Sequence, residues 1–98
     1  MAVKILIRRN LPDEADPLVQ ELLRELRMLA VQQEGYISGE TLHRIDGPGE
    51  ILVISTWRSP GAWTKWFENP VRREIQAKID RRLGKETRYA IYGYGPGA

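Results

Sequence analysis

The order in which hydrophobic periodicity changes along this sequence restricts its possible folds more than any other feature. Apolar residues alternate with polar ones over 3–9, recur at helical spacing over 17–30 and alternate again over 36–45, and an apolar run that ends in tryptophan follows over 51–57. Alternation is typical of strands, and spacing by three and four is typical of an amphipathic helix. The segment 46–49, Asp-Gly-Pro-Gly, separates the last two stretches and predicts a hairpin turn.

The expected helices begin at residue pairs that combine a capping side chain with proline. These pairs are Asp16-Pro17, Ser59-Pro60 and Asn69-Pro70. The first residue can accept a hydrogen bond from the first turn, and proline suits the first helical position. We expect Asn69-Pro70 to interrupt the second helix and restart it, and Gly84 to follow its end. Tyr89, Ile91 and Tyr92 then mark a last strand.

Element boundaries and strand faces follow from the same patterns. We expect Pro12 to end the first strand and Glu34-Gly35 to end the first helix. Alternation in the second strand places one set of residues on a common face: Ile37, Gly39, Thr41, His43 and Ile45.

The resulting order is strand, helix, strand, strand, helix, strand, which is the ferredoxin-like βαββαβ pattern of an α+β domain. We expect a four-stranded antiparallel sheet with both helical crossovers on one face, in a single domain over 1–93 with a flexible tail over 94–98. Leu6, Leu52 and Ile54 fall on the opposite face, which should therefore be covered. A second copy is the simplest cover, so we expect a homodimer through the sheet face.

Composition excludes several classes of function. The formal net charge is +2 and there is no cysteine, so neither a disulfide framework nor a thiolate site is possible. The basic residues of the C-terminal third, including Arg72, alternate with acidic ones and are interpreted as a solvated helix face. We expect a cytoplasmic protein with no membrane partner, no nucleic-acid partner, no metal and no cofactor.

Three tryptophans lie close together where a strand passes into a helix. Trp57 ends the strand, and Trp63 and Trp66 follow at helical spacing. Aromatic walls of this kind stack on flat apolar ligands, which indicates a pocket for a small aromatic molecule. The same residues suit an ordinary hydrophobic core, and the sequence leaves both interpretations open.

Two segments of the sequence, on either side of the expected hairpin, resemble those of a known family. They are Gly-Tyr-Ile-Ser-Gly-Glu over 35–40 and Val-Ile-Ser-Thr-Trp-Arg-Ser over 53–59, which leads into an aromatic-rich helix. On these segments and the hairpin between them, the sequence resembles the antibiotic biosynthesis monooxygenase family of dimeric α+β barrels. The similarity extends from Val3 to Tyr92. Members of known activity oxidise polyaromatic phenols or anthrones to quinones with molecular oxygen, without metal or flavin. The resemblance implies a pocket between sheet and helices for a flat aromatic substrate.

The resemblance also implies candidate site residues. Trp63 and Trp66 lie where the family's substrate-facing tryptophan usually lies, and Trp57 and Tyr89 are further substrate-binding candidates. His43 is the only side chain with an ordinary titration range near neutrality, so it is the candidate general base, and Tyr36 could donate to a substrate oxygen.

A related branch of the family degrades haem. That branch carries an asparagine at the end of the first strand, which Asn10 could match, and it requires a histidine on the second helix. The segment 70–83 contains no histidine, so haem degradation is disfavoured.

Two functions remain at this stage. The first is a cofactor-independent monooxygenase that oxidises a small aromatic phenol or hydroquinone, with His43, Asn10 and Tyr36 as catalytic candidates. The second is a non-catalytic dimeric module that binds a small apolar ligand or acts as a stress or accessory protein.

Overall fold

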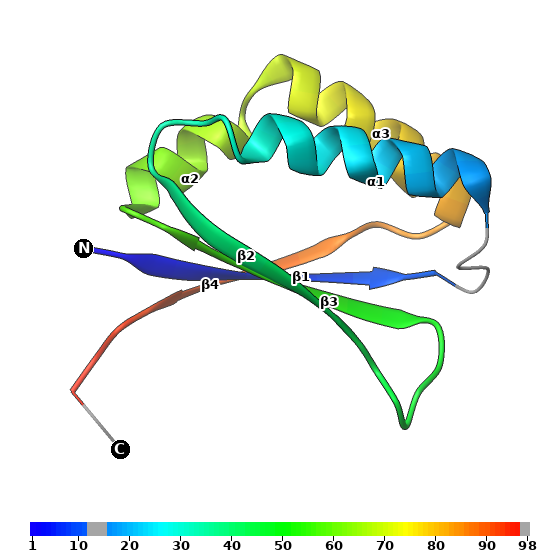
Figure 1. Ribbon diagram of the computed structural model, residues 1–98, viewed down its shortest axis with the longest axis horizontal. Helices are drawn as coiled ribbons and strands as arrows, with labels where there is room; N and C mark the ends of the chain where they lie inside the picture. Colours follow the sequence, from blue (N-terminus) through cyan, green and yellow to red (C-terminus); the bar gives the residue numbers. More distant parts are fainter. Residues whose placement is uncertain (12–15, 97–98) are drawn as a thin grey trace.

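The protein folds as one antiparallel sheet covered on one face by helices (Figure 1). The computed structural model describes residues 1–11 and 16–96. Its elements, in chain order, are β1 (Val3–Asn10), α1 (Pro17–Ala30), β2 (Tyr36–His43), β3 (Glu50–Trp57), α2 (Pro60–Phe67), α3 (Pro70–Leu83) and β4 (Arg88–Gly93). Within the described residues the sheet has four strands in the order β2-β3-β1-β4, and every neighbouring pair is antiparallel. The predicted ferredoxin-like α+β fold is confirmed.

The predicted helix starts are also confirmed. Asp16, Ser59 and Asn69 each accept a hydrogen bond from a backbone N–H of the first turn, and a proline follows each of them. These caps satisfy donors that have no partner inside the helix. At the other end of α3, Gly84 adopts the left-handed conformation with a φ of 71°, and its N–H donates to the Asp80 carbonyl.

The predicted end of the first helix was wrong by about one turn. Helix α1 ends at Ala30, and Glu34 lies in the turns that follow. Gly35 has another role, because its φ is 90° and a Cβ atom there would lie 2.5 Å from the Cβ of Ala62. It lets the chain pass close to α2 in a conformation that favours glycine. Pro12, the predicted end of the first strand, lies outside the described residues.

Strand β2 departs from simple alternation near its start. Tyr36 lies opposite Trp57 and Ser38 lies opposite Thr56, so two residues of β2 span one step of β3. This bulge at Ile37 brings Tyr36 onto the face that carries Gly39 and interrupts the predicted alternation. Ile45 lies beyond the end of β2 and is 95% exposed, so it belongs to neither face.

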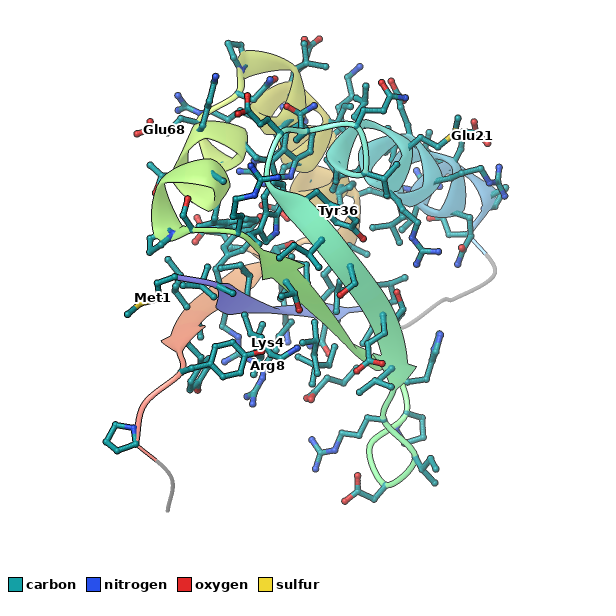
Figure 2. All side chains as sticks on the ribbon, turned by 60° about the vertical axis from the view of Figure 1, so that its left-hand side comes forward. Met1, Lys4, Arg8, Glu21, Tyr36 and Glu68 are labelled. Carbon is teal, nitrogen blue, oxygen red and sulfur yellow. The ribbon has the colours of Figure 1, made fainter. Side chains whose placement is uncertain are left out.

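The core lies between the sheet and the helices. β1 contributes Val3, Ile5 and Ile7. The other fully buried members come from α1, β3, α2 and α3: Leu22, Leu26, Trp57, Trp63, Trp66, Ile75 and Ile79. Lys4 and Arg8 project from β1 on the side away from the helices, as Figure 2 shows. In 1–11 and 16–96, no helix combines the length and hydrophobicity needed to cross a membrane.

Candidate functional site

A cavity of about 810 Å³ lies between the sheet and the helices. Its floor is the helix-facing side of β1, β2 and β3, and its roof comes mainly from α1 and α2. Volumes of this order are typical of sites that hold a drug-sized organic molecule. The cavity is therefore the natural candidate for a functional site.

Aromatic side chains line the cavity at the junction of β3 with α2. The indole N–H of Trp57 donates to the Ser55 hydroxyl at 3.1 Å, which satisfies the only polar atom of a side chain that is 1% exposed. The Trp63 ring lies edge-on to Trp57, with ring centroids 5.7 Å apart, and packs against Phe67 and Tyr89. These neighbours restrict Trp63 to one orientation.

Trp66 lines the same cavity in a different environment. It is 5% exposed, but it belongs to none of the ring pairs that hold Trp63. Among the described residues its indole N–H makes no hydrogen bond, whereas that of Trp57 does. Trp66 therefore lacks the aromatic neighbours that hold Trp63, and its indole N–H is unused among the described residues, a distinction that sequence spacing left open.

Tyr36 and Gly39 form one wall together. The Tyr36 ring meets Trp57 edge to face, with centroids 5.4 Å apart and an interplanar angle of 88°. Its hydroxyl lies directly over Gly39, where a Cβ atom would come within 2.6 Å of the Tyr36 oxygen. The absent side chain of Gly39 thus makes room for the Tyr36 hydroxyl, and both residues line the cavity.

His43 lies at the rim of the cavity, at the end of β2. Its register partner is Ile51, and it shares the helix-facing side of the sheet with Thr41. Arg27 of α1 donates to the Thr41 hydroxyl at 2.7 Å, which ties the roof to the floor close to His43. His43 is exposed, so it can be reached both from bulk solvent and from the cavity.

Asn10 is the one predicted site residue that the structure does not bring to the cavity. It is exposed, and it alternates with Arg9, so it lies on the other side of β1 from the cavity. The remaining candidates, Tyr36, His43, Trp57, Trp63, Trp66 and Tyr89, all line it.

Two arginines of the cavity escaped the sequence prediction. Arg9 is 7% exposed and Arg72 is 5% exposed, so the interpretation of Arg72 as part of a solvated helix face was wrong. Arg72 is held by its Nε, which donates to the Phe67 carbonyl, and by its Nη1, which donates to the Tyr89 hydroxyl. Arg9 could have been found from alternation, because it continues the inward series Val3, Ile5 and Ile7.

Burial perturbs the electrostatics of Arg9. Desolvation lowers the pKa of its guanidinium, and the nearby Arg72 lowers it further, while Tyr89 and Asp80 oppose the shift. Arginine starts from so high a pKa that it keeps its charge near neutrality. In the ranges 1–11 and 16–96, no cluster of histidine, aspartate and glutamate side chains could hold a metal ion.

Fold and site together define a class: a small ferredoxin-like α+β protein with an aromatic-lined cavity between its sheet and its helices. The family model for antibiotic biosynthesis monooxygenases matches residues 2–78, and the chain belongs to that family. The resemblance expected from the sequence is confirmed. No curated protein sequence matches the chain.

Several solved structures share the fold. A conserved protein from Methanosarcina mazei Go1 is 20% identical with a TM-score of 0.82, over 94% of this chain and 91% of that one. Rv0793 from Mycobacterium tuberculosis is 18% identical with a TM-score of 0.81, and the match covers 100% of this chain and 99% of that one. SnoaB, a cofactor-independent oxygenase from Streptomyces nogalater, is 14% identical with a TM-score of 0.79, and the match covers 98% of this chain and 95% of that one. At these identities the likeness concerns the fold.

Proposed function

We propose that this protein is a cofactor-independent monooxygenase that oxidises a small aromatic phenol or hydroquinone with molecular oxygen. The observation that carries the proposal is the cavity of about 810 Å³ lined by Trp57, Trp63 and Trp66 in a member of this family. The similarity in fold to SnoaB, itself a cofactor-independent oxygenase, supports the same reaction class.

The reaction requires the protein to position the substrate and to accept and donate protons. A phenol loses its proton, and the electron-rich anion supplies electrons to oxygen. One oxygen atom enters the ring to give a quinone, and the other leaves as water together with the two hydrogens lost by the substrate. A dry cavity favours this chemistry because water would solvate the anion and compete for protons.

The geometry suggests a role for each group. Trp66 stacks on the substrate ring, since it lines the cavity and, among the described residues, has neither an aromatic neighbour nor a hydrogen bond for its N–H. His43 accepts the phenolic proton at the rim, where solvent can remove it. The Tyr36 hydroxyl, which lies over Gly39, donates to the substrate oxygen that becomes the carbonyl.

Oxygen uptake tests this proposal. Purified protein is assayed with an electrode against anthrones, dihydroxynaphthalenes and hydroquinones, corrected for spontaneous oxidation. We expect saturable uptake that falls at least tenfold in Trp66→Phe and in His43→Gln. Tyr94→Phe and Arg44→Gln, at exposed positions outside the cavity, should retain wild-type rates. Absence of uptake, with ligand binding retained, would refute the oxygenase and favour a non-catalytic binding module.

We further propose that the protein works as a homodimer through the face of the sheet that the helices leave uncovered. Leu6, Leu52 and Ile54 lie half-buried on that face, and Leu42 and Tyr92 are more exposed, at 45% and 56%. An apolar surface spread over all four strands favours a self-complementary partner.

Charges on the same face support the two-fold arrangement. Glu40 lies on the edge strand β2. The basic residues lie toward the opposite edge of the sheet: Lys4 and Arg8 on β1, and Arg88 on β4. A two-fold axis lets the acidic side of one copy meet the basic side of the other. Light scattering should give twice the chain mass for the wild type and for Val71→Glu, a control on an exposed helix position. Ile54→Glu should be monomeric, and a monomeric wild type would contradict the dimer.

A further inference from the structure

Arg9 is an incompletely satisfied cation in the floor of the cavity. Its Nη2 donates to the Gln76 side-chain oxygen at 3.1 Å. Its Nε is buried and has no hydrogen-bond partner among the described residues. The side chain nevertheless lines the cavity, so the space above it is available to a ligand.

Arg72 places a second positive charge in the lining of the same cavity. It lies on α3 one turn before Gln76, and its guanidinium stacks over the Phe67 ring at 4.6 Å and over the Tyr89 ring at 5.6 Å. Within residues 1–11 and 16–96, neither Arg9 nor Arg72 forms an ion pair with a carboxylate. The cavity wall thus holds two buried cations and no paired anion.

Asp80, the carboxylate whose charge acts on Arg9, hydrogen-bonds to other side chains. One oxygen of Asp80 accepts from the Gln76 amide at 2.8 Å and from the Thr87 hydroxyl at 2.9 Å. Gln76 therefore stands between Asp80 and Arg9, accepting from the arginine and donating to the aspartate. This chain holds the Arg9 guanidinium in place without neutralising it, so Gln76 is a positioning residue.

An unpaired buried charge is costly for a fold and is normally compensated by an opposite charge. Guanidinium offers planar paired donors that match the two oxygens of a carboxylate. One Nη2 hydrogen is taken by Gln76, whereas the Nε hydrogen and the remaining Nη hydrogens stay unused among the described residues. The missing partner is therefore best supplied by a carboxylate on the molecule that occupies the cavity.

We propose that the cavity binds an aromatic carboxylic acid, with the ring against the tryptophan wall and the carboxylate on Arg9, supported by the charge of Arg72. This proposal rests on the proposed function in taking the aromatic occupant of the cavity as the substrate. It narrows that substrate to a hydroxylated aromatic acid. The electron-rich ring then lies beside Trp66, while the carboxylate serves as the anchor.

Isothermal titration calorimetry with two probes of equal shape tests the anchor. The probes are 2-naphthoate, which is anionic at neutral pH, and 2-naphthamide, which is neutral. For the wild type we expect naphthoate to bind about 10- to 100-fold more tightly, the usual contribution of a charge-assisted hydrogen bond. Equal affinities, or no binding of naphthoate, would overturn the proposal. Tighter binding of neutral 2-naphthol than of naphthoate would also overturn it, because the anchor would then serve a phenol.

Variants assign the preference to Arg9. Arg9→Gln should lose the preference for naphthoate and keep its affinity for naphthamide, and Arg9→Lys should retain part of it. Arg73→Gln is the matched control, since Arg73 is adjacent in sequence to Arg72 but is exposed and lies outside this cavity. A preference that survives Arg9→Gln would refute the assignment. Should that variant fail to fold, the wild-type comparison of the two probes decides alone.

The binding test is independent of turnover. If naphthoate binds as expected and no substrate consumes oxygen, the anion site stands and the oxygenase proposal fails. If oxygen uptake is observed with neutral phenols alone and naphthoate does not bind, the oxygenase stands and the anion site fails.

Discussion

The contact between Gly39 and the Tyr36 hydroxyl can be tested by adding one methyl group. In Gly39→Ala the new Cβ would lie 2.6 Å from the Tyr36 oxygen, whereas ordinary contact begins at 3.4 Å, so the hydroxyl must withdraw by about 0.8 Å. The Tyr36 ring has little freedom to do so, because its edge-to-face contact with Trp57 fixes it from the other side.

The expected cost combines two opposing effects. Overpacking at a restricted site costs about 1–3 kcal/mol, and replacing glycine by alanine in a strand gains about 0.5–1 kcal/mol. Gly39→Ala should therefore destabilise the wild type by about 1–2 kcal/mol. For a domain of this size the melting temperature should fall by about 4–16 °C.

Tyr36→Phe provides the matched background. Without the hydroxyl, the nearest ring atom to the new methyl group is Cζ at 3.6 Å, an ordinary contact. Gly39→Ala should then stabilise the Tyr36→Phe protein by about 0.5 kcal/mol, so the substitution changes sign between the two backgrounds.

Thermal and urea unfolding of the four proteins, at one fixed protein concentration, measure this coupling. Fixed concentration is needed because the proposed dimer would make the measured stability depend on concentration. If Gly39→Ala has the same effect with and without the Tyr36 hydroxyl, the hydroxyl does not lie over Gly39, and this account of the cavity wall is refuted.

Two further predictions concern the frame around the site. Gly35→Ala combines a left-handed backbone, φ 90°, with a 2.5 Å approach to Ala62, so we expect it to lower the unfolding free energy by about 2–4 kcal/mol. Gly84 has a φ of 71°, but a Cβ atom added there would meet no atom within 4 Å, so Gly84→Ala should lower the unfolding free energy by only about 1 kcal/mol in urea titrations. Equal losses for the two substitutions would contradict the packing argument. Arg82, which hydrogen-bonds to Asp16 at 2.8 Å, holds the pKa of that carboxyl below its usual value of about 3.9, so ionised Asp16 favours the folded state above that pH. Asp16→Asn should therefore lower the urea midpoint at pH 7 and have a smaller effect as the pH falls below about 4, and a difference that grows in acid would contradict this sign.

Much of the candidate site was accessible from sequence, because its aromatic residues belong to regular elements. Trp63 and Trp66 follow a cap at Ser59, so their place on one helix could be predicted. Which of them is held by other aromatic rings depends on Phe67 and Tyr89, and Tyr89 comes from a strand that follows later in the chain.

Other features of the site depended on contacts that no local pattern encodes. The bulge at Ile37 brings Tyr36 to the cavity, and simple alternation excludes it. Arg72 appeared among alternating charges on a helix that looked solvated, and it is buried because α2 and β4 supply its partners Phe67 and Tyr89. Asn10 was assigned by family resemblance, but strand alternation turns it away from the cavity.

The sequence by itself determined the order of the elements, the helix starts and the inward face of β1. These depend on residues within a few positions of each other, through periodicity, capping and turn conformation. The tertiary structure decided where Gly35 packs, which arginines are buried and where a cavity remains between the sheet and the helices. Those outcomes follow from how elements distant in the chain pack together, and the chemistry of the cavity depends on them.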